Sequence, residues 1–310
     1  MKLKNSLGFI LLLFLACKQE KKGELIPKKE DSNYLIEFDE FEKISKKATT
    51  KIIDFRKQHL YQKEHIPNAL NIWRSDIENK EFPYKGMMAS KLQIEKLFSR
   101  LGIKNGDTLI IYDDNGLCDA ARLWWILQNY DYINTKLLHG GFSGWKKNKK
   151  NTTSLTTKIT PSVFKLKENS SMKFHLSKNT ILKSLGNSKI LIDTRTPDEY
   201  SGKRQKKGAF KGGRIPTSRL IDWATAINYT GDKKMKSKEN LEKIYSTIIK
   251  SKNDTVFVYC HSGVRSAHTT FVLTQLLNYK NVKNYDGSWT EWSYFNDLPI
   301  EKDSITTIKN

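Results

Sequence analysis

Residues 108–125 read TLIIYDDNGLCDAARLWW, and residues 255–272 read TVFVYCHSGVRSAHTTFV, 147 positions later. Each stretch begins with a short apolar run, Thr108 to Tyr112 or Thr255 to Tyr259, which is typical of a strand buried on both faces. Each run is followed by a loop and then by an apolar pattern with helical spacing. Strands that alternate with helices in this way predict an α/β fold, with a mostly parallel sheet flanked by helices.

The correspondence between the two stretches extends through most of the chain. An Asp-x-Arg segment, an Ile-Pro pair, a helical segment, a glycine and a tryptophan occur in the same order in both halves. The matching positions are Asp54 with Asp193, Ile66 with Ile215, Ser90 with Ser237, Gly140 with Gly287, and Trp145 with Trp292. A repeat of this length predicts two domains with the same topology. We place them at residues 34–150 and 173–302, joined by a polar linker at 151–172.

The first 17 residues have a different character. Lys2 and Lys4 precede an apolar run that is too short to cross a bilayer and that ends at Cys17. The pattern resembles a bacterial lipoprotein signal peptide at residues 1–17, followed by a charged tether at 18–33. We expect lipidation of Cys17, export, and anchoring to a membrane of the cell envelope on the periplasmic side. An ordinary secretory signal or a short anchor is the alternative.

The chain is strongly basic, with a net charge of +21 from 54 basic and 33 acidic residues. Only nine of the basic residues are arginine, and the lysines are scattered along the chain. Nucleic-acid-binding proteins concentrate their basic residues on one face and use arginine to read bases, so we expect no nucleic-acid partner. A positive field still favours the approach of small anions.

Cys260 stands where the second buried strand turns into a helix. The thiolate is the reactive form of cysteine, and a free thiol titrates near about 8.5. A helix N-terminus presents unpaired N–H groups and a partial positive charge, which lower a thiol pKa and bind anions. Gly263 allows the loop to curl, and Arg265 adds a permanent cation. The pattern predicts a reactive cysteine at residue 260.

The first half carries no equivalent nucleophile. Asp113 occupies the position of Cys260, and a carboxylate lacks the reactive thiol, so we expect the first loop to be inactive. Cys118 matches Arg265 instead, at the far end of its loop, and we interpret it as a small structural residue.

The second half resembles the catalytic domain of the rhodanese family, the thiosulfate sulfurtransferases, and the first half resembles the family's non-catalytic domain. The resemblance rests on four segments of the second half, Asp193 to Arg195, Gly213 to Pro216, Cys260 to Arg265, and Asn281 to Trp292. It implies two tandem rhodanese-like domains and a persulfide on Cys260, with no metal and no organic cofactor. The residues expected to cradle the donor anion and the persulfide are His261, Ser262, Gly263, Val264 and Arg265.

Four further residues are expected to support this loop. Asp193 and Arg195 are expected to pair and brace it, and Asp286 and Trp289 to shape the neighbouring wall. His261 could bind the donor or tune the thiolate, but a solvent-facing histidine is the preferred interpretation.

The expected reaction moves sulfane sulfur from thiosulfate to a thiophilic acceptor, which is cyanide, a thiol or a protein. Glu199 stands where mercaptopyruvate sulfurtransferases carry a carboxylate-binding arginine, and the loop ends in Gly-Val-Arg rather than Gly-Val-Thr; both differences favour thiosulfate. The alternatives are a 3-mercaptopyruvate sulfurtransferase, a non-catalytic lipoprotein that relays sulfur and, less favoured, a cysteine phosphatase. Phosphatase loops have five residues between Cys and Arg, whereas four separate Cys260 from Arg265.

Overall fold

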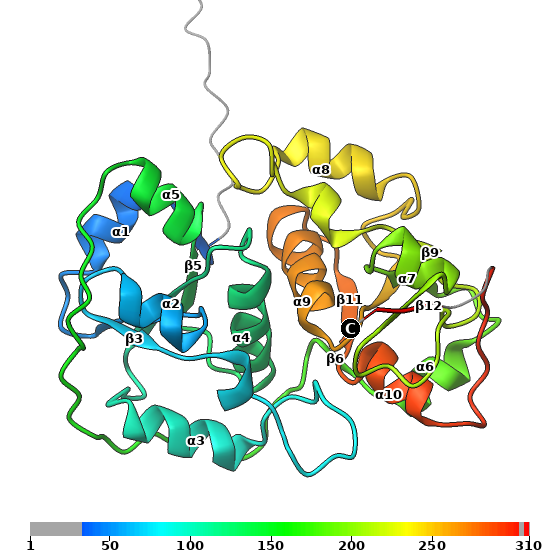
Figure 1. Ribbon diagram of the computed structural model, residues 1–310, viewed down its shortest axis with the longest axis horizontal. Coiled ribbons are helices and arrows are strands. Elements are labelled where there is room, and N and C mark those ends of the chain that lie inside the picture. The colour runs from blue at the N-terminus through cyan, green and yellow to red at the C-terminus, as the bar shows by residue number, and fades with distance from the viewer. Residues whose placement is uncertain (1–32, 304–306, 310) are drawn as a thin grey trace, which may run out of the picture. The chain divides into compact units, whose positions relative to one another are not determined.

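The structure is a computed structural model that describes residues 33–303 and the backbone of 307–309. The expected signal peptide, the tether up to residue 32, and Cys17 lie outside these residues. Within the described part of the chain, no helix is long and apolar enough to cross a membrane. Two α/β halves follow one another along the chain, and each contains a five-stranded sheet with helices on both faces (Figure 1).

The first half has a parallel sheet with the strand order β1-β5-β4-β2-β3. Its strands are β1 (Leu35–Ile36), β2 (Thr50–Asp54), β3 (Ala69–Asn71), β4 (Thr108–Tyr112) and β5 (Thr135–Leu138). Its helices are α1 (Phe38–Ile44), α2 (Gln58–Lys63), α3 (Lys91–Arg100), α4 (Cys118–Asn129) and α5 (Gly141–Lys147), with a 3-10 turn, η1, at Arg74–Asp76. The apolar run that predicted a buried strand is the central strand, β4.

The second half repeats this arrangement with the order β6-β11-β10-β7-β9, again parallel. Its strands are β6 (His175–Leu176), β7 (Ile190–Asp193), β9 (Arg219–Leu220), β10 (Thr255–Tyr259) and β11 (Asn281–Tyr285), and β8 (Arg204–Lys206) pairs separately with β12 (Thr307–Lys309). Its helices are α6 (Lys178–Ser184), α7 (Pro197–Ser201), α8 (Lys238–Tyr245), α9 (Val264–Phe271) and α10 (Ser288–Tyr294), with a 3-10 turn, η2, at Trp223–Ala226. The α/β repeat predicted from the sequence is therefore present in both halves.

The equivalent helices α3 and α8 begin with the same kind of cap. The Ser90 hydroxyl accepts a hydrogen bond from the Gln93 amide, and the Ser237 hydroxyl accepts one from the Asn240 amide. Such a cap satisfies one of the backbone N–H groups that a helix start leaves without a partner.

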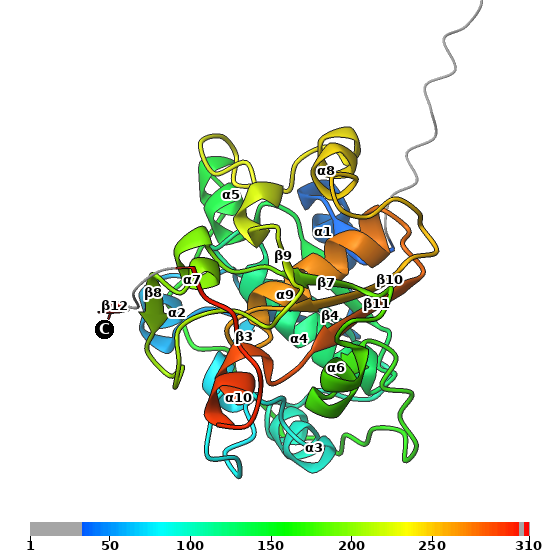
Figure 2. The ribbon, with the colours of Figure 1, turned by 90° about the vertical axis from the view of Figure 1, so that its right-hand side faces the viewer.

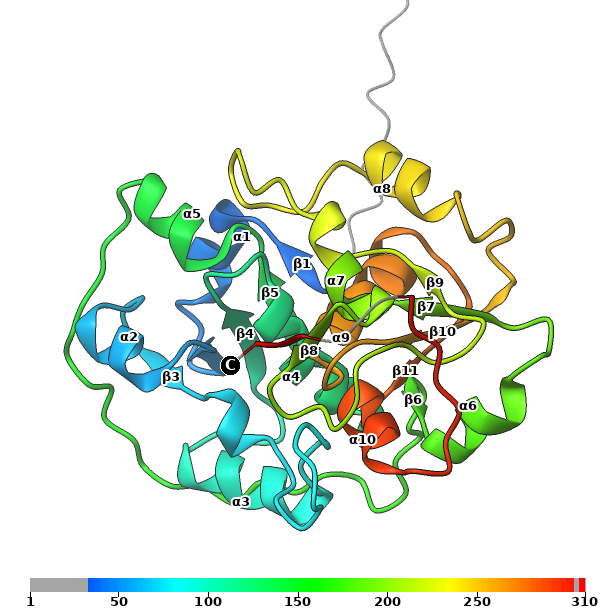
Figure 3. The same cartoon turned by 45° about the vertical axis from the view of Figure 1, so that its right-hand side comes forward.

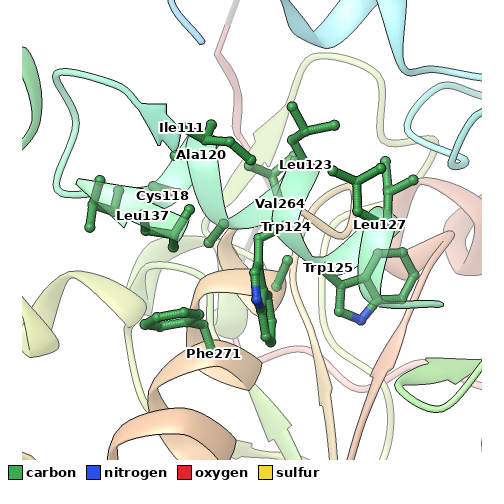
Figure 4. Packing of buried hydrophobic residues seen from close by; sticks show 14 of the residues in the cluster. Ile111, Cys118, Ala120, Leu123, Trp124, Trp125, Leu127, Leu137, Val264 and Phe271 are labelled. Atoms are coloured by element: carbon green, nitrogen blue, oxygen red, sulfur yellow. The ribbon is translucent and has the colours of Figure 1, made fainter. Parts of the chain in front are cut away.

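The core between the two halves is built on α4 and α9, the helices that follow β4 and β10. They pack against each other, and the Trp124 ring meets the Phe271 ring edge to face, with 4.9 Å between centroids (Figure 4). The same apolar cluster includes one face of each sheet. On the opposite face of the second sheet lie α6 and α10, so that β7, β10 and β11 are covered on both sides (Figure 2). Because α9 begins at the Cys260 loop, this interface also fixes the loop.

The segment expected to be the linker contains no helix or strand of its own. It leaves α5, follows the outer side of the first half past α2 and α3, and enters β6 (Figure 3). Thr153 forms an antiparallel bridge with His65, and the fully buried Phe164 ring packs on Phe98 and Tyr132. The segment is therefore tied to the first half by hydrogen bonds and by apolar contacts.

Candidate active site

The Cys260 loop is shorter than the sequence suggested. Cys260 follows β10 directly, and α9 already begins at Val264, so Val264 and Arg265 belong to the first helical turn. Gly263 is the N-cap, with a φ of 74° that disfavours side chains. A Cβ at this position would lie 2.6 Å from the Asp286 carbonyl oxygen. The tight packing of the loop therefore requires glycine here.

The Ser288 side chain holds the Cys260 loop in place through hydrogen bonds. Its hydroxyl oxygen accepts hydrogen bonds from the backbone amides of Cys260, at 3.1 Å, and Gly263, at 3.0 Å. The same hydroxyl donates to the Tyr285 carbonyl at 2.8 Å. The Cys260 carbonyl accepts a bond from the Trp289 amide, so that the N-terminus of α10 holds both sides of the nucleophile's backbone.

The surroundings of the Cys260 sulfur favour its thiolate form. The residue is 1% exposed, and burial by itself raises the thiol pKa. The Arg265 charge, the Ser266 hydroxyl and the amides of Ser262 and Ser266 act in the opposite direction and outweigh burial, so the pKa of Cys260 is lowered. The loop and the N-terminal turn of α9 therefore place N–H groups and a cation around the same sulfur atom.

The Glu199 carboxylate holds the Arg265 side chain in place. Its two terminal nitrogens donate to the two Glu199 carboxylate oxygens at 2.6 and 2.8 Å. Burial raises the pKa of Glu199, but the hydrogen bonds and charge of Arg265 outweigh it and hold that pKa well below its usual range. Glu199 is therefore not a free negative charge that could repel an anionic donor, because Arg265 neutralises the carboxylate.

His261 is buried, which corrects the interpretation of a solvent-facing side chain. It is 8% exposed, and its Nε2 lies 3.1 Å from the Lys207 carbonyl oxygen. Burial, followed by the charges of Lys206 and Arg265, lowers the pKa of His261 to about 3. The imidazole is therefore neutral at physiological pH, and with Nε2–H donating to Lys207, its Nδ1 is a lone-pair acceptor.

Asp193 and Arg195 pair as expected, and both are fully buried. The Arg195 Nη2 donates to Asp193 at 2.6 Å and to the Gly213 carbonyl at 2.7 Å. The guanidinium lies over the Trp289 ring, 4.6 Å from its centroid. The pair thus braces Trp289, whose own amide holds the Cys260 carbonyl, and reaches the loop through that ring.

Asp286 joins the two halves. Its carboxylate accepts hydrogen bonds from Arg122 of α4, at 2.5 Å, and from the Met88 amide, at 3.0 Å. Arg122 also donates to the carbonyls of Gly86 and Gly263, at 2.8 and 3.3 Å. A buried ion pair therefore connects the first half to the N-cap of the catalytic helix.

A cavity of about 180 Å³ opens beside the Cys260 loop, and both halves line it. The second half contributes His261, Ser262, Val264 and Lys207, and the first half contributes Arg74, Lys85 and Arg122 among others. The charged residues of this lining are Arg74, Lys85, Arg122, Lys207 and the acidic Glu78, so the cavity beside the Cys260 loop has a net positive charge that suits a small anion.

In the equivalent loop of the first half, the Asp113 side chain occupies the place where the backbone amides could bind an anion. The Asp113 carboxylate accepts hydrogen bonds from four backbone amides, of Asn115, Leu117, Asp119 and Ala120, at 2.8–3.0 Å. Burial, together with the neighbouring Asp119, raises the pKa of Asp113 to about 7. Cys118 is buried in α4, and burial raises its pKa well above the usual value. Asp113 has no thiol, and the raised pKa of Cys118 disfavours its thiolate form.

A family model described as a rhodanese-like domain matches residues 37–148 and 177–294. The chain belongs to the rhodanese family. A protein of Mycobacterium tuberculosis (strain CDC 1551 / Oshkosh), named "Putative thiosulfate sulfurtransferase SseA", is 35% identical over 248 residues, covering 78% of this chain and 81% of that protein. A Saccharopolyspora erythraea protein, named "Putative thiosulfate sulfurtransferase", is 33% identical over 248 residues, covering 78% and 86%. The Tum1 protein from Saccharomyces cerevisiae shares the fold, with a TM-score of 0.77 at 20% identity, over 87% of this chain and 98% of that one.

The two domains predicted from the internal repeat, and their rhodanese-like character implied by the resemblance, are thus confirmed. The sequence did not show how the first domain takes part in the site. Arg122 and Arg74 of that domain reach the cavity, and neither was predicted as a site residue. Arg122 carried a usable signal, because a charged residue followed by Leu123, Trp124 and Trp125 on a helix expected to be buried needs a partner. Ser266 and Ser288 carried none, since serine is common in loops and at helix starts.

Proposed function

We propose that the protein is a thiosulfate sulfurtransferase in which Cys260 carries the sulfur as a persulfide. The observation that carries this proposal is the position of Cys260 between β10 and the N-terminus of α9, in a loop whose backbone amides Ser288 holds. Burial raises the pKa of the thiol there, but the Arg265 charge and the nearby N–H and O–H groups outweigh it and lower the pKa. The names of the relatives support sulfurtransferase activity, and the basic cavity supports an anionic donor.

The proposed reaction has two displacement steps. The Cys260 thiolate attacks the outer sulfur of thiosulfate; a sulfur–sulfur bond forms to Cys260, and the bond to the sulfonate breaks, so that sulfite leaves with the electron pair. Cyanide or a thiolate then attacks the outer persulfide sulfur and restores the Cys260 thiolate. The loop amides and the Ser266 hydroxyl stabilise the anionic sulfur in both states.

Thiosulfate rather than 3-mercaptopyruvate is the proposed donor. Because Glu199 is neutralised by Arg265, the preference does not depend on repulsion from a free carboxylate. It depends instead on charge, because thiosulfate carries two negative charges at neutral pH and 3-mercaptopyruvate one, and the arginine and lysine lining of the cavity attracts the dianion more strongly. Steady-state kinetics with both donors test this, and a higher specificity constant for 3-mercaptopyruvate would overturn it.

A role as a sulfur carrier is the second candidate, because a stable persulfide can also serve a protein partner. Intact mass spectrometry after exposure to thiosulfate should report the added mass of one sulfur atom, located on Cys260 by peptide mapping. Turnover with cyanide at the rate of persulfide formation supports an enzyme. A stable persulfide with very slow turnover supports a carrier.

We also propose that the chain is exported and anchored to a membrane of the cell envelope through lipid on Cys17. The support is the Lys2–Cys17 sequence pattern alone. Mass spectrometry of natively produced protein tests it: the expected N-terminus is a lipidated Cys17. An unmodified N-terminus elsewhere in the chain overturns it.

A further inference from the structure

Arg74 reaches the cavity from the first domain, on the 3-10 turn that follows β3. Its Nε lies 2.5 Å from Asp119 Oδ1, and its Nη2 contacts the same oxygen. About 40% of the side chain stays accessible, and the guanidinium lines the cavity that His261, Ser262 and Val264 line from the second domain. Asp119 therefore holds one edge of the Arg74 guanidinium, and the rest of this group is exposed to the cavity.

Asp119, which holds Arg74, is itself placed by the inactive loop. It stands in the first turn of α4, and its amide donates to the Asp113 carboxylate at 2.8 Å. Burial lowers the pKa of Arg74, but the Asp119 charge outweighs it, so the guanidinium stays charged, and its charge interacts with Cys260. The loop of the first domain, which has Asp113 at the position of Cys260, thus positions a cation at the cavity beside the Cys260 loop.

The other two arginines of the site are more enclosed than Arg74. Arg265 directs both terminal nitrogens to Glu199, and Arg122 directs its own to Asp286 and to two backbone carbonyls. The Arg74 ion pair uses Nε and Nη2, and within residues 33–303 no hydrogen bond engages Nη1. The Arg74 side chain is 40% exposed, against 13% for Arg265 and 4% for Arg122, so it is the most accessible of the three to a ligand in the cavity.

We infer that Arg74 binds the anionic group of the sulfur donor, and that Asp119 is its positioning residue. The inference rests on the proposed sulfurtransferase function, and the ligand class is a small oxyanion such as the sulfonate end of thiosulfate. Arginine suits this task because its planar donors match the oxygens of such an anion. Donor specificity is thus shared between the domains: the second domain activates the thiol, and the first domain holds the charge that leaves as sulfite.

Kinetics of Arg74→Met and Arg74→Lys provide the first test, with Arg100→Met as the control. Arg100 is exposed at the end of α3, so its replacement removes the same charge from the same domain away from the cavity. Arg74→Met should lower kcat/KM for thiosulfate about 10- to 100-fold, mainly through KM, because one charge-assisted contact is lost. Arg74→Lys should restore part of the lost kcat/KM. Asp119→Asn should lower kcat/KM by less than Arg74→Met does, with kcat nearly unchanged. The discharge of preformed persulfide by cyanide should change less than the loading step.

Alkylation of Cys260 supplies a second readout that needs no sulfur transfer. Iodoacetate carries a negative charge and iodoacetamide does not, so the ratio of their rates reports anion binding beside the thiol, after correction for the thiol pKa. Arg74→Met should lower this ratio about 10-fold, whereas Arg100→Met should not. An unchanged ratio together with an unchanged KM overturns the inference. If the wild type takes no sulfur from thiosulfate while the ratio still depends on Arg74, the proposed donor is wrong and the anion site stands.

Discussion

Cys260 and Cys118 have similar burial but opposite electrostatic surroundings. Both are about 1% exposed, yet the pKa of Cys260 is lowered and that of Cys118 is raised. The difference arises because Arg265, Ser266 and the loop amides face the first sulfur, whereas the carboxylates of Asp119 and Asp113 act on the second. Burial therefore does not decide reactivity here; the donors that face each sulfur do.

Replacement of each cysteine tests this contrast. Cys260→Ser should abolish sulfur transfer from thiosulfate to cyanide with the circular dichroism spectrum unchanged, because an alcohol does not accept sulfane sulfur. Cys118→Ser should retain most of the activity. The assay is thiocyanate formation by both purified variants, and an active Cys260→Ser protein would exclude Cys260 as the sulfur carrier.

Arg265 should affect both catalysis and stability, since it neutralises a buried carboxylate. Arg265→Ala should lower kcat/KM for thiosulfate about 10- to 100-fold and raise the thiol pKa measured by iodoacetamide alkylation. It should also destabilise the fold by about 3–5 kcal/mol, because Glu199 is left buried without its partner. The double variant Glu199→Gln, Arg265→Met, which removes both charges, should unfold at a higher denaturant concentration than Arg265→Ala. Equal stability of these two variants would show that the ion pair carries no such cost.

The same ion pair gives the pH dependence a definite sign. The pKa of folded Glu199 lies below its usual value of 4.5, so the pair stabilises the fold fully above that pH. Its contribution is lost as the pH falls below 4.5 toward the folded-state pKa. Urea unfolding at pH 7 and pH 4 should therefore show a larger loss for the wild type than for the double variant. A parallel loss in both would assign acid sensitivity to other groups.

At the scale of elements, much of the site was predictable because it follows one strand and begins one helix. The apolar run Thr255–Tyr259 located β10, and the glycine three residues after Cys260 located the turn into α9. What the sequence did not reveal was the contact between elements that are distant in the chain. Ser288 on α10 and Glu199 on α7 meet the loop only in the folded protein, and neither residue type signals such a role. The burial of His261 was missed for the same reason, since Lys207 lies 54 positions away.

The turn into α9 makes a prediction about Gly263. Gly263→Ala should lose activity and destabilise the protein by at least about 1–3 kcal/mol, because alanine is strained at a φ of 74° and its Cβ would lie 2.6 Å from the Asp286 carbonyl oxygen. Gly106→Ala is the matched control, since a Cβ there meets nothing within 4 Å. Denaturant unfolding and the cyanide assay on both variants are the measurements. Normal activity in Gly263→Ala would mean that the loop relaxes without harm to the anion cradle.

At the scale of the whole described molecule, the first domain has no cysteine at the position of Cys260, but its residues contribute to the site. Arg122 crosses from α4 to Asp286 and to the Gly263 carbonyl, and Asp119 holds Arg74 at the cavity. Both arginines depend on the contact between α4 and α9, whose apolar residues join one continuous core. The internal repeat predicted two similar domains, but not that their equivalent helices would pack on each other. The first domain, which has an aspartate at the position of the catalytic cysteine, therefore has a structural role in the site of the second domain.

Two tryptophans of the first domain separate this support from stability in general. Trp124 faces Phe271 of α9 at the interface, whereas Trp145 packs on Phe41 within the first domain, 5.1 Å between ring centroids. Both are well buried, so Trp124→Ala and Trp145→Ala should each destabilise the protein by about 3–5 kcal/mol. Only Trp124→Ala should also slow persulfide formation and shift the alkylation profile of Cys260, because the cavity it leaves lets α9 move together with the loop at its N-terminus. Stopped-flow loading with thiosulfate, at a temperature where both variants are folded, is the measurement. Equal loading rates in the two variants would mean that the catalytic loop is rigid without the first domain, and that α4 contributes stability alone.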